Sequence, residues 1–296
     1  MRLNELYDED LVEGPIADRL KRLAAAGAVA GGLGLGGYSA LNAPKSPEQT
    51  ISVAQKQQDA QTDTKAADEP ESKPEKAEKQ VNPNFPKGLT DIDKMTVDQR
   101  VHTFIKTVAP LITSENAKII AERNRLIHFV KIIRSGKKLN KEENAWLNGL
   151  ADKYDEDNIP DLLKKVDIIP ASLAIAQAAI ESQWGQDEKT QKGNVFFGQK
   201  SWAKTGGVEG PQGERYRAFD RPEDSISEYM HNLNTHDAYE DFRNNRAQMR
   251  QKNKPITGLA LVGGLKKYAD TKGAYPVQLA SIIKGRNLQQ YDIAKK

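Results

Sequence analysis

The feature that most constrains the fold is a run of 13 residues that is apolar on nearly every side of a helix. Residues 172–184 read SLAIAQAAIESQW, and Gly185, a good helix terminator, follows them. A helix that is apolar all round is a buried helix, so the rest of the folded part must surround it. Glu181 stands in its last turn, directly after the apolar residues. The sequence therefore predicts a core built around one helix, with the side-chain carboxyl group of Glu181 in the last turn of that helix.

Two effects raise the pKa that we expect for Glu181. Burial disfavours the charged carboxylate, and the partial negative charge at the C-terminal end of a helix disfavours it as well. A glutamic acid that keeps its proton near neutral pH can act as a general acid. The alternative is a surface glutamate on the one solvent-exposed stripe of the helix, and the pattern alone leaves both interpretations open.

The segments around this helix predict an α+β domain that is mainly α, with a small β-lobe. Helical spacing covers residues 101–108, before Pro110, and again residues 119–133, which Gly136 should end. Asn140 and Glu143 form a capping box, and a short helix is expected near 160–167. Glycines and aromatic residues over 193–220 predict loops with one or two short strands. Helices are expected again over residues 222–239, 257–269 and 275–288.

The N-terminal third has a different composition. Residues 1–22 form a charged leader, and residues 23–41 form an uncharged, Ala/Gly-rich hydrophobic segment. Residues 42–94 are rich in Lys, Glu, Gln, Asp, Ala and Pro, so we expect a disordered linker that acts as a tether. The folded domain is expected over residues 95–296. The 19 residues of 23–41 are about long enough to span a bilayer core. A membrane anchor or uncleaved export signal, a cleaved signal peptide and a flexible segment all fit them.

Charge and cysteine content narrow the chemistry. The chain has no Cys, which excludes a disulfide scaffold, a thiol nucleophile and a thiolate metal site. Residues 96–296 carry 32 basic and 25 acidic residues, net +7, which suits an anionic polymer as partner. We expect no nucleic acid, because no zinc pattern or strong basic cluster is present. We also expect no cofactor and no metal, since His231 and His236 do not share a helix face well.

The residues after the buried helix suit glycan chemistry. Hydrolysis of a glycosidic bond needs a protonated acid and usually a second carboxylate, and Glu209 and Glu214 both lie in the glycine-rich stretch. Aromatic faces suit stacking on sugar rings, although each ring, taken alone, fits a place in the core better. The aromatic candidates are Trp184, Phe197, Trp202 and Tyr216.

Three segments in order resemble the glucosaminidase domains of bacterial cell-wall hydrolases, a family that includes flagellar peptidoglycan hydrolases and autolysins. They are IIPASLAIAQAAIESQWG (168–185), GNVFFGQK (193–200) and YRAFDRPEDSISEYMHNLNTHDAY (216–239). The run LNTH at 233–236, with Ala238 and Tyr239, is similar to the Bax-like branch of that family. The resemblance covers roughly residues 95–290.

The resemblance implies a lysozyme-like fold and an endo-β-N-acetylglucosaminidase that cleaves the GlcNAc-β-1,4-MurNAc bond of peptidoglycan. The family's catalytic acid falls on Glu181. By spacing, Glu214 is the second carboxylate and Glu209 the alternative. Tyr229 should line the substrate cleft and Tyr239 should support it or pack in the core. The full set of expected substrate-binding residues is Trp184, Phe197, Gln199, Trp202, Tyr216, Tyr229 and Tyr239.

The implied partner is a peptidoglycan glycan strand, with a membrane contact if residues 23–41 are an anchor. The implied location is the cell envelope, facing the periplasm, whether anchored in the inner membrane or exported, or the virion if a phage encodes the chain. A muramidase or a lytic transglycosylase on the same fold remains open, as does a non-catalytic wall-binding module. Sequence gives no oligomeric state.

Overall fold

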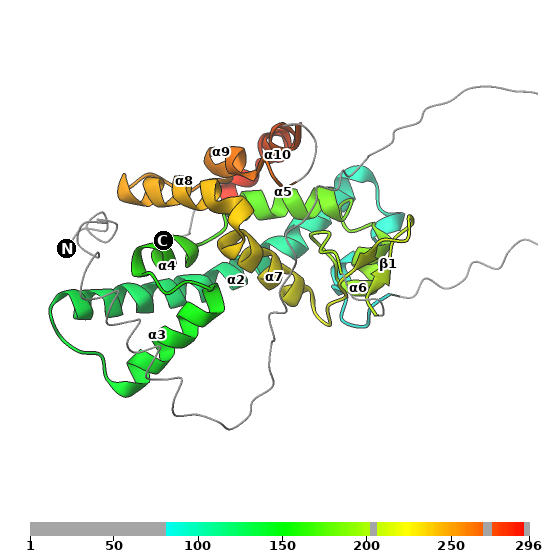
Figure 1. Ribbon diagram of the computed structural model, residues 1–296. Coiled ribbons are helices and arrows are strands. Elements are labelled where there is room, and N and C mark those ends of the chain that lie inside the picture. Colours follow the sequence, from blue (N-terminus) through cyan, green and yellow to red (C-terminus); the bar gives the residue numbers. More distant parts are fainter. Residues whose placement is uncertain (1–80, 202–205, 269–273, 293–296) are drawn as a thin grey trace, which may run out of the picture.

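The computed structural model describes residues 81–201, 206–268 and 274–292. They form a mainly helical domain with one small antiparallel sheet, which confirms the predicted fold class (Figure 1). The expected leader, the segment 23–41 and most of the expected linker lie outside these residues. The elements, in order, are η3 Lys87–Leu89, η4 Ile92–Lys94, α2 Val97–Arg134, α3 Lys141–Tyr154, α4 Ile159–Lys165, α5 Ala171–Glu181, α6 Glu188–Gly193, β1 Val208–Glu209, β2 Arg215–Tyr216, α7 Pro222–Thr235, η5 Asp237–Tyr239, α8 Glu240–Gln251, α9 Gly258–Leu261, η6 Val262–Leu265, α10 Ala274–Gly285 and η7 Leu288–Tyr291.

Helix α5 lies at the centre of the main hydrophobic cluster, as its apolar pattern predicts. Every residue from Ala171 to Ala179 is buried, and α2, α9, α10 and η7 pack around the helix. Its N-cap residue, Pro170, makes no side-chain cap. Asp292 supplies that cap from the far end of the chain, because its carboxylate accepts bonds from the backbone N–H and the hydroxyl of Ser172, at 2.8 and 2.6 Å. The C-terminal segment therefore closes the core over α5.

The end of α5 is three residues earlier than the predicted position 184. The helix ends at Glu181, and Gln183, Trp184 and Gly185 all have positive φ angles, of 50°, 59° and 86°. A left-handed run of this kind cannot continue a right-handed helix. The chain turns sharply after Glu181, and this turn leaves the carboxyl group at the tip of a buried helix.

The break that we expected at Pro110 is absent, because α2 runs from Val97 to Arg134 without interruption. Proline has no N–H, so the helix lacks one hydrogen bond at that turn. Pro110 itself is exposed, while Val108 and Ile112 on either side of it are buried in the core. The continuous buried face of α2 outweighs the local cost of the proline. The helix ends before Gly136, as predicted.

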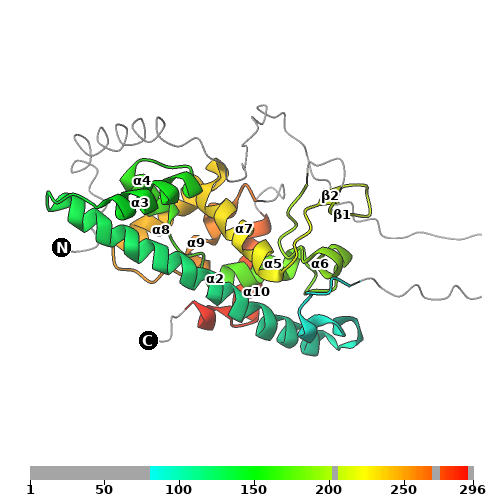
Figure 2. The ribbon, with the colours of Figure 1, turned by 90° about the horizontal axis from the view of Figure 1, so that it is seen from below.

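A second hydrophobic cluster lies at the other end of α2. There α3 and α4 cover its C-terminal half, away from the small lobe (Figures 1 and 2). The predicted capping box of Asn140 and Glu143 is present at the start of α3. This cluster supports the long helix but contributes no residue to the surroundings of Glu181.

The folded part begins earlier than the predicted boundary at residue 95. Phe85, Leu89 and Ile92, which we assigned to the linker, are buried in the main cluster beside α2. The backbone N–H of Asn82 also donates to the carbonyl of Gln191 at 2.8 Å. The charged composition of residues 42–94 as a whole predicted a linker, but these three apolar residues at its end belong to the core.

The small lobe consists of α6 and the two-stranded sheet. Strands β1 and β2 pair antiparallel, with Val208 opposite Tyr216 and Glu209 opposite Arg215. The predicted strands are therefore present, but α6 and α8 were not predicted as separate helices. The helix expected over 222–239 stops at Thr235 and is followed by the 3₁₀ turn η5. The lobe packs against the C-terminal end of α5 (Figure 2).

Candidate functional site

Glu181 lies where the buried helix α5 meets the small lobe. One carboxylate oxygen, Oε1, accepts a hydrogen bond from the hydroxyl of Tyr275 in α10, at 3.1 Å. The backbone carbonyl of Glu181 accepts a bond from Lys189 of α6, at 3.0 Å. Lys189 is only eight residues from Glu181, whereas Tyr275 is 94 residues away, so a long-range contact holds the carboxyl group itself.

The surroundings raise the pKa of Glu181 above the ordinary glutamate value. Burial is the largest cause, and the hydrogen bond from Tyr275 and the positive charge of Lys189 oppose it. Asp187 adds a smaller raising effect. This direction agrees with the prediction from the sequence and suits a carboxyl group that donates a proton.

Aromatic side chains surround Glu181 on the side of α7 and α10. Phe197 stacks on Tyr229 with ring centroids 3.7 Å apart. Tyr268 stacks on Tyr275 at 5.3 Å, and Tyr239 lies 6.0 Å from Tyr268. We call Tyr229, Tyr239, Tyr268 and Tyr275 the tyrosine cluster. Burial raises the pKa of all four hydroxyls, so they remain protonated hydrogen-bond donors at neutral pH.

Gly198 approaches the other oxygen of Glu181. A Cβ atom at this position would lie 3.0 Å from Oε2 of Glu181. Gly198 also has a φ angle of +64°, which side-chain-bearing residues rarely adopt. Glycine is therefore required here for two reasons, and its absent side chain leaves room beside Oε2.

Glu214 occupies a very different environment in the small lobe. Its carboxylate accepts bonds from the backbone N–H of Gln212 at 2.9 Å and from the hydroxyl of Tyr216 at 3.0 Å. A hydrogen bond from its own backbone N–H is the largest cause that lowers its pKa, and the other two bonds and Lys200 add to it. The two carboxyl groups are therefore shifted in opposite directions, with the pKa of Glu214 lowered and the pKa of Glu181 raised.

Tyr216 and Lys189 connect the two carboxyl groups. The ammonium group of Lys189 lies 5.1 Å from the centre of the Tyr216 ring and forms an ion pair with Asp187 at 2.8 Å. It also donates to the carbonyl of Glu181, and Tyr216 donates to Glu214. The arrangement attaches the sheet to the end of α5.

Glu209, the alternative second carboxylate, faces away from this connection. Its side chain is 65% exposed and lies 3.8 Å from the guanidinium group of Arg215, its partner across the sheet. Such an exposed pair is a weak interaction. Of the two candidates, Glu214 is the one tied through Tyr216 to the end of α5.

Three of the other expected substrate-binding residues have structural contacts, and one cannot be placed. Trp184 packs edge-to-face on Phe104 of α2, with ring centroids 5.6 Å apart. Gln199 uses both ends of its amide on Ser225 of α7. Phe197 is buried beneath Tyr229. Trp202 lies outside the described residues.

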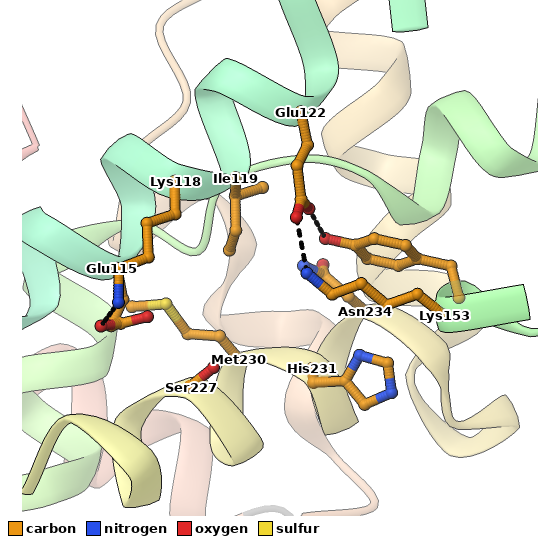
Figure 3. Close-up of a pocket in the computed structure, with 10 residues that line it drawn as sticks. Glu115, Lys118, Ile119, Glu122, Lys153, Ser227, Met230, His231 and Asn234 are labelled. Atoms are coloured by element: carbon orange, nitrogen blue, oxygen red, sulfur yellow. Dashed lines mark hydrogen bonds and ion pairs between the residues drawn. The ribbon is translucent and has the colours of Figure 1, made fainter. Parts of the chain in front are cut away.

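A polar pocket lies elsewhere, between α2, α3 and α7 (Figure 3). Its charged groups are paired with each other: Lys118 with Glu115 at 2.6 Å, and Lys153 with Glu122 at 2.6 Å. The residues that line it are Glu115, Lys118, Ile119, Glu122, Lys153, Tyr154, Ser227, Met230, His231 and Asn234.

This pocket is separate from the surroundings of Glu181. At 100° per residue along α7, Ser227 and His231 of this pocket project about 160° away from Tyr229, which is nearly the opposite face of the helix. Burial lowers the pKa of His231, so the imidazole is neutral at neutral pH. Because its charged groups are paired with one another, the pocket offers a ligand little electrostatic preference.

The described ranges contain neither a cluster of metal-ligating side chains nor a membrane-spanning helix. No three His, Asp or Glu side chains within them gather as a metal-binding group. Within the same ranges, no helix combines the length and the apolar character needed to cross a bilayer. Residues 23–41 lie outside the described residues, so the anchor stays a prediction.

The part of the chain that contains this site matches a known protein family. Residues 157–288 match the family described as glucosaminidase, mannosyl-glycoprotein endo-beta-N-acetylglucosaminidase. This part of the chain is similar to the glucosaminidase family. The match begins at α4 and runs to the start of η7, so it includes both carboxyl groups and the tyrosine cluster.

The chain is also similar to a curated protein, Protein bax of Escherichia coli strain K12. The two chains are 38% identical over 187 residues, which are 59% of this chain and 65% of the relative. The chain thus spans less than two thirds of that relative's length. This match confirms the predicted similarity to the Bax-like branch.

A solved structure, the catalytic domain of the autolysin Auto from Listeria monocytogenes, also matches. It is 19% identical and covers 52% of this chain and 89% of that domain, with a TM-score of 0.33.

Sequence reasoning missed three groups that contact this site. Tyr268 and Tyr275 lie in or beside expected helices, and nothing in their local sequence distinguishes them from core residues. Gln177 did carry a signal. It is the polar side chain within the apolar run LAIAQAAI, four residues before Glu181 and so on the same helix face.

Proposed function

We propose that this domain is a peptidoglycan hydrolase, an endo-β-N-acetylglucosaminidase that cleaves the GlcNAc-β-1,4-MurNAc bond. In this proposal Glu181 protonates the oxygen of the leaving sugar. The reaction needs an acid that still holds its proton near neutral pH. The family of the domain supports the class of reaction, and the resemblance of its motifs to wall hydrolases supports the substrate.

The observation that carries the proposal is the environment of Glu181. Its carboxyl group stands at the tip of a buried helix, accepts one bond from Tyr275, and has room beside its second oxygen at Gly198. Burial raises its pKa. A structural carboxylate in a core would be expected to have an ion-pair partner, whereas here the nearby lysine bonds the backbone carbonyl of Glu181.

Glu214 is the second carboxylate in this proposal. Its lowered pKa keeps it ionised, as a base or a nucleophile must be. Tyr216 beside it would contact the glycan, and Tyr239 would support the tyrosine cluster that faces the acid. A basic domain also suits the anionic wall polymer, so we propose the cell envelope as the location.

One observation favours a second candidate, a lytic transglycosylase. The charged groups that shift the pKa of Glu181 are Lys189 and Asp187, whereas Glu214 acts on the pKa of Tyr216. A single acid suffices when the sugar's own substituents take the place of a nucleophile. In that case Glu214 would hold Tyr216 in place and would not react.

Digestion of two substrates tests the proposal. The full-length protein and its Glu181→Gln variant are incubated with purified peptidoglycan and with a glycoprotein that carries high-mannose glycans. Mass spectrometry then identifies the fragments. Peptidoglycan fragments with GlcNAc at the reducing end, absent for the variant, are the expected result.

The other outcomes are equally specific. Anhydro-MurNAc ends would assign a lytic transglycosylase, and MurNAc reducing ends a muramidase. Cleavage of the glycoprotein alone would move the substrate to the glycans named for the family. Binding to peptidoglycan without products from either form would assign a wall-binding module.

A further inference from the structure

We propose that Gln177 is a positioning residue that holds the hydroxyl of Tyr275 on Glu181 and thereby selects the oxygen that carries the transferable proton. The inference rests on the proposed role of Glu181 as an acid. Gln177 lies one helical turn before Glu181 in α5 and is fully buried. A buried amide costs free energy unless its polar atoms are satisfied, so its partners require explanation.

The amide of Gln177 joins two tyrosines of different helices. Its carbonyl oxygen, Oε1, accepts from the hydroxyl of Tyr229 at 2.6 Å. Its Nε2 donates to the hydroxyl oxygen of Tyr275 at 3.2 Å. Tyr275 in turn donates to Oε1 of Glu181 at 3.1 Å. Gln177 thus links α7, α10 and the acid through one side chain.

The direction of this chain is fixed by its donors. A tyrosine hydroxyl has one hydrogen, and Tyr275 gives it to Glu181 because Gln177 presents an N–H to its oxygen. Tyr229 can satisfy the other end of the amide because burial raises its pKa and keeps its hydroxyl protonated. The order of donation is therefore Tyr229 to Gln177 to Tyr275 to Glu181.

This order has a consequence for the acid. Oε1 of Glu181 accepts a hydrogen bond, so in the neutral acid the proton resides on Oε2. That oxygen faces Gly198, where the absent side chain leaves space. Without Gln177, the hydroxyl of Tyr275 would be free to rotate away, and the proton could occupy either oxygen.

Other titratable groups surround Glu181, and a variant that tests Gln177 must leave these residues unsubstituted. They come from every element packed around it: Asp187 and Lys189 from the α6 segment, Tyr216 from β2, Tyr229 from α7, Tyr239 from η5, Tyr268, and Tyr275 from α10. A Gln177→Met substitution replaces none of these residues; it keeps the approximate size of the side chain but removes its hydrogen bonds to Tyr229 and Tyr275.

The test combines a titration with a double-mutant cycle on the full-length protein. The pKa of Glu181 is measured by carbon NMR of its carboxyl group in the wild type, Gln177→Met, Tyr275→Phe and the double variant. The bond from Tyr275 lowers the pKa of Glu181, so its loss should raise that pKa in Gln177→Met. In the Tyr275→Phe background, Gln177→Met should cause little further shift, since it acts through Tyr275. This readout needs no substrate.

Activity gives the second readout. We expect Gln177→Met to lower kcat about tenfold with little change in KM, and to move the alkaline limb of the rate profile to higher pH. Asn116→Leu is the matched control, because it removes another buried amide that bonds the backbone of Ile169, away from the acid. It should lower stability without moving the pH profile.

Two results would overturn the positioning role. One is an unchanged Glu181 pKa in Gln177→Met. The other is a Gln177→Met shift of equal size with and without the Tyr275 hydroxyl. An inactive wild type with the expected pKa shifts would refute the proposed function and leave the positioning role standing.

Discussion

The C-terminal end of α5 and the hairpin of the small lobe each carry a glutamate. The two environments shift the pKa of the glutamate in opposite directions. Glu181 is enclosed by packed tyrosines, and burial raises its pKa. Glu214 lies on a surface hairpin, where hydrogen bonds from backbone N–H groups and Tyr216 lower its pKa. The same side chain therefore favours its protonated form in one region and its ionised form in the other.

The contrast shows how the domain can hold an acid and a base at one pH. Two carboxyl groups with pKa values driven apart are a common basis for assigning acid and base roles. Helix burial supplies one environment, and a tight hairpin rich in N–H donors supplies the other. Substitutions at or beside Glu181 and Glu214 should therefore change activity and stability by different amounts.

The largest effect is expected for Glu181→Gln. The amide cannot donate an acidic proton to the leaving oxygen, so we expect kcat to fall by about 10³-fold or more. Release of reducing ends from peptidoglycan measures it. Glu188→Gln, an exposed carboxyl group in α6, is the control and should retain activity. Comparable losses in both variants would show that charge near the lobe matters and not the acid.

A smaller loss is expected for Glu214→Gln, at about 10²-fold. Glu209→Gln, in the same hairpin and paired only across the sheet, should stay within about twofold of the wild type. The same assay compares them. If Glu209→Gln were the more damaging change, the roles assigned to the two carboxylates would have to be exchanged.

Gly198→Ala should have a moderate effect. The new Cβ would lie 3.0 Å from Oε2 of Glu181 at a φ angle of +64°, so we expect about a tenfold loss of kcat and about 1 kcal/mol of stability. Thermal denaturation and kinetics measure the two effects. Gly206→Ala separates backbone strain from the clash, because its φ angle is also positive but a Cβ atom there meets nothing. Equal kinetic losses in both would remove the argument for space beside Oε2.

The smallest effect concerns stability. A raised folded-state pKa means that the proton on Glu181 stabilises the folded protein at low pH, below the pKa of an unfolded glutamate. This contribution is lost as pH rises through the folded-state pKa. Glu181→Gln removes the dependence, so the variant should gain melting temperature relative to the wild type between acid and neutral pH. A difference that stays constant over this range would argue against the raised pKa.

The sequence predicted the parts of the site that depend on local pattern. The apolar run around Ala176 required burial, and Glu181 at its end followed directly. The glycine-rich stretch predicted the hairpin that carries Glu214. The capping box at Asn140 was predicted because its signal lies within four residues.

The missed parts depend on contacts between distant segments. Tyr275 reaches Glu181 across 94 positions of the chain, and no local pattern encodes that approach. Pro110 was expected to break a helix, but packing along α2 outweighed its local preference. Phe85 and Leu89 belong to the core even though the stretch that precedes them is rich in charged and polar residues. Local composition therefore misplaced the boundary of the domain.

The most direct test is a carbon NMR titration of both carboxyl groups in the full-length protein, with Glu181→Gln and Glu214→Gln used to assign the signals. The account predicts that Glu181 titrates above the ordinary glutamate value of 4.5 and Glu214 below it. A Glu181 that titrates at or below Glu214 would contradict the assignment of Glu181 as the acid.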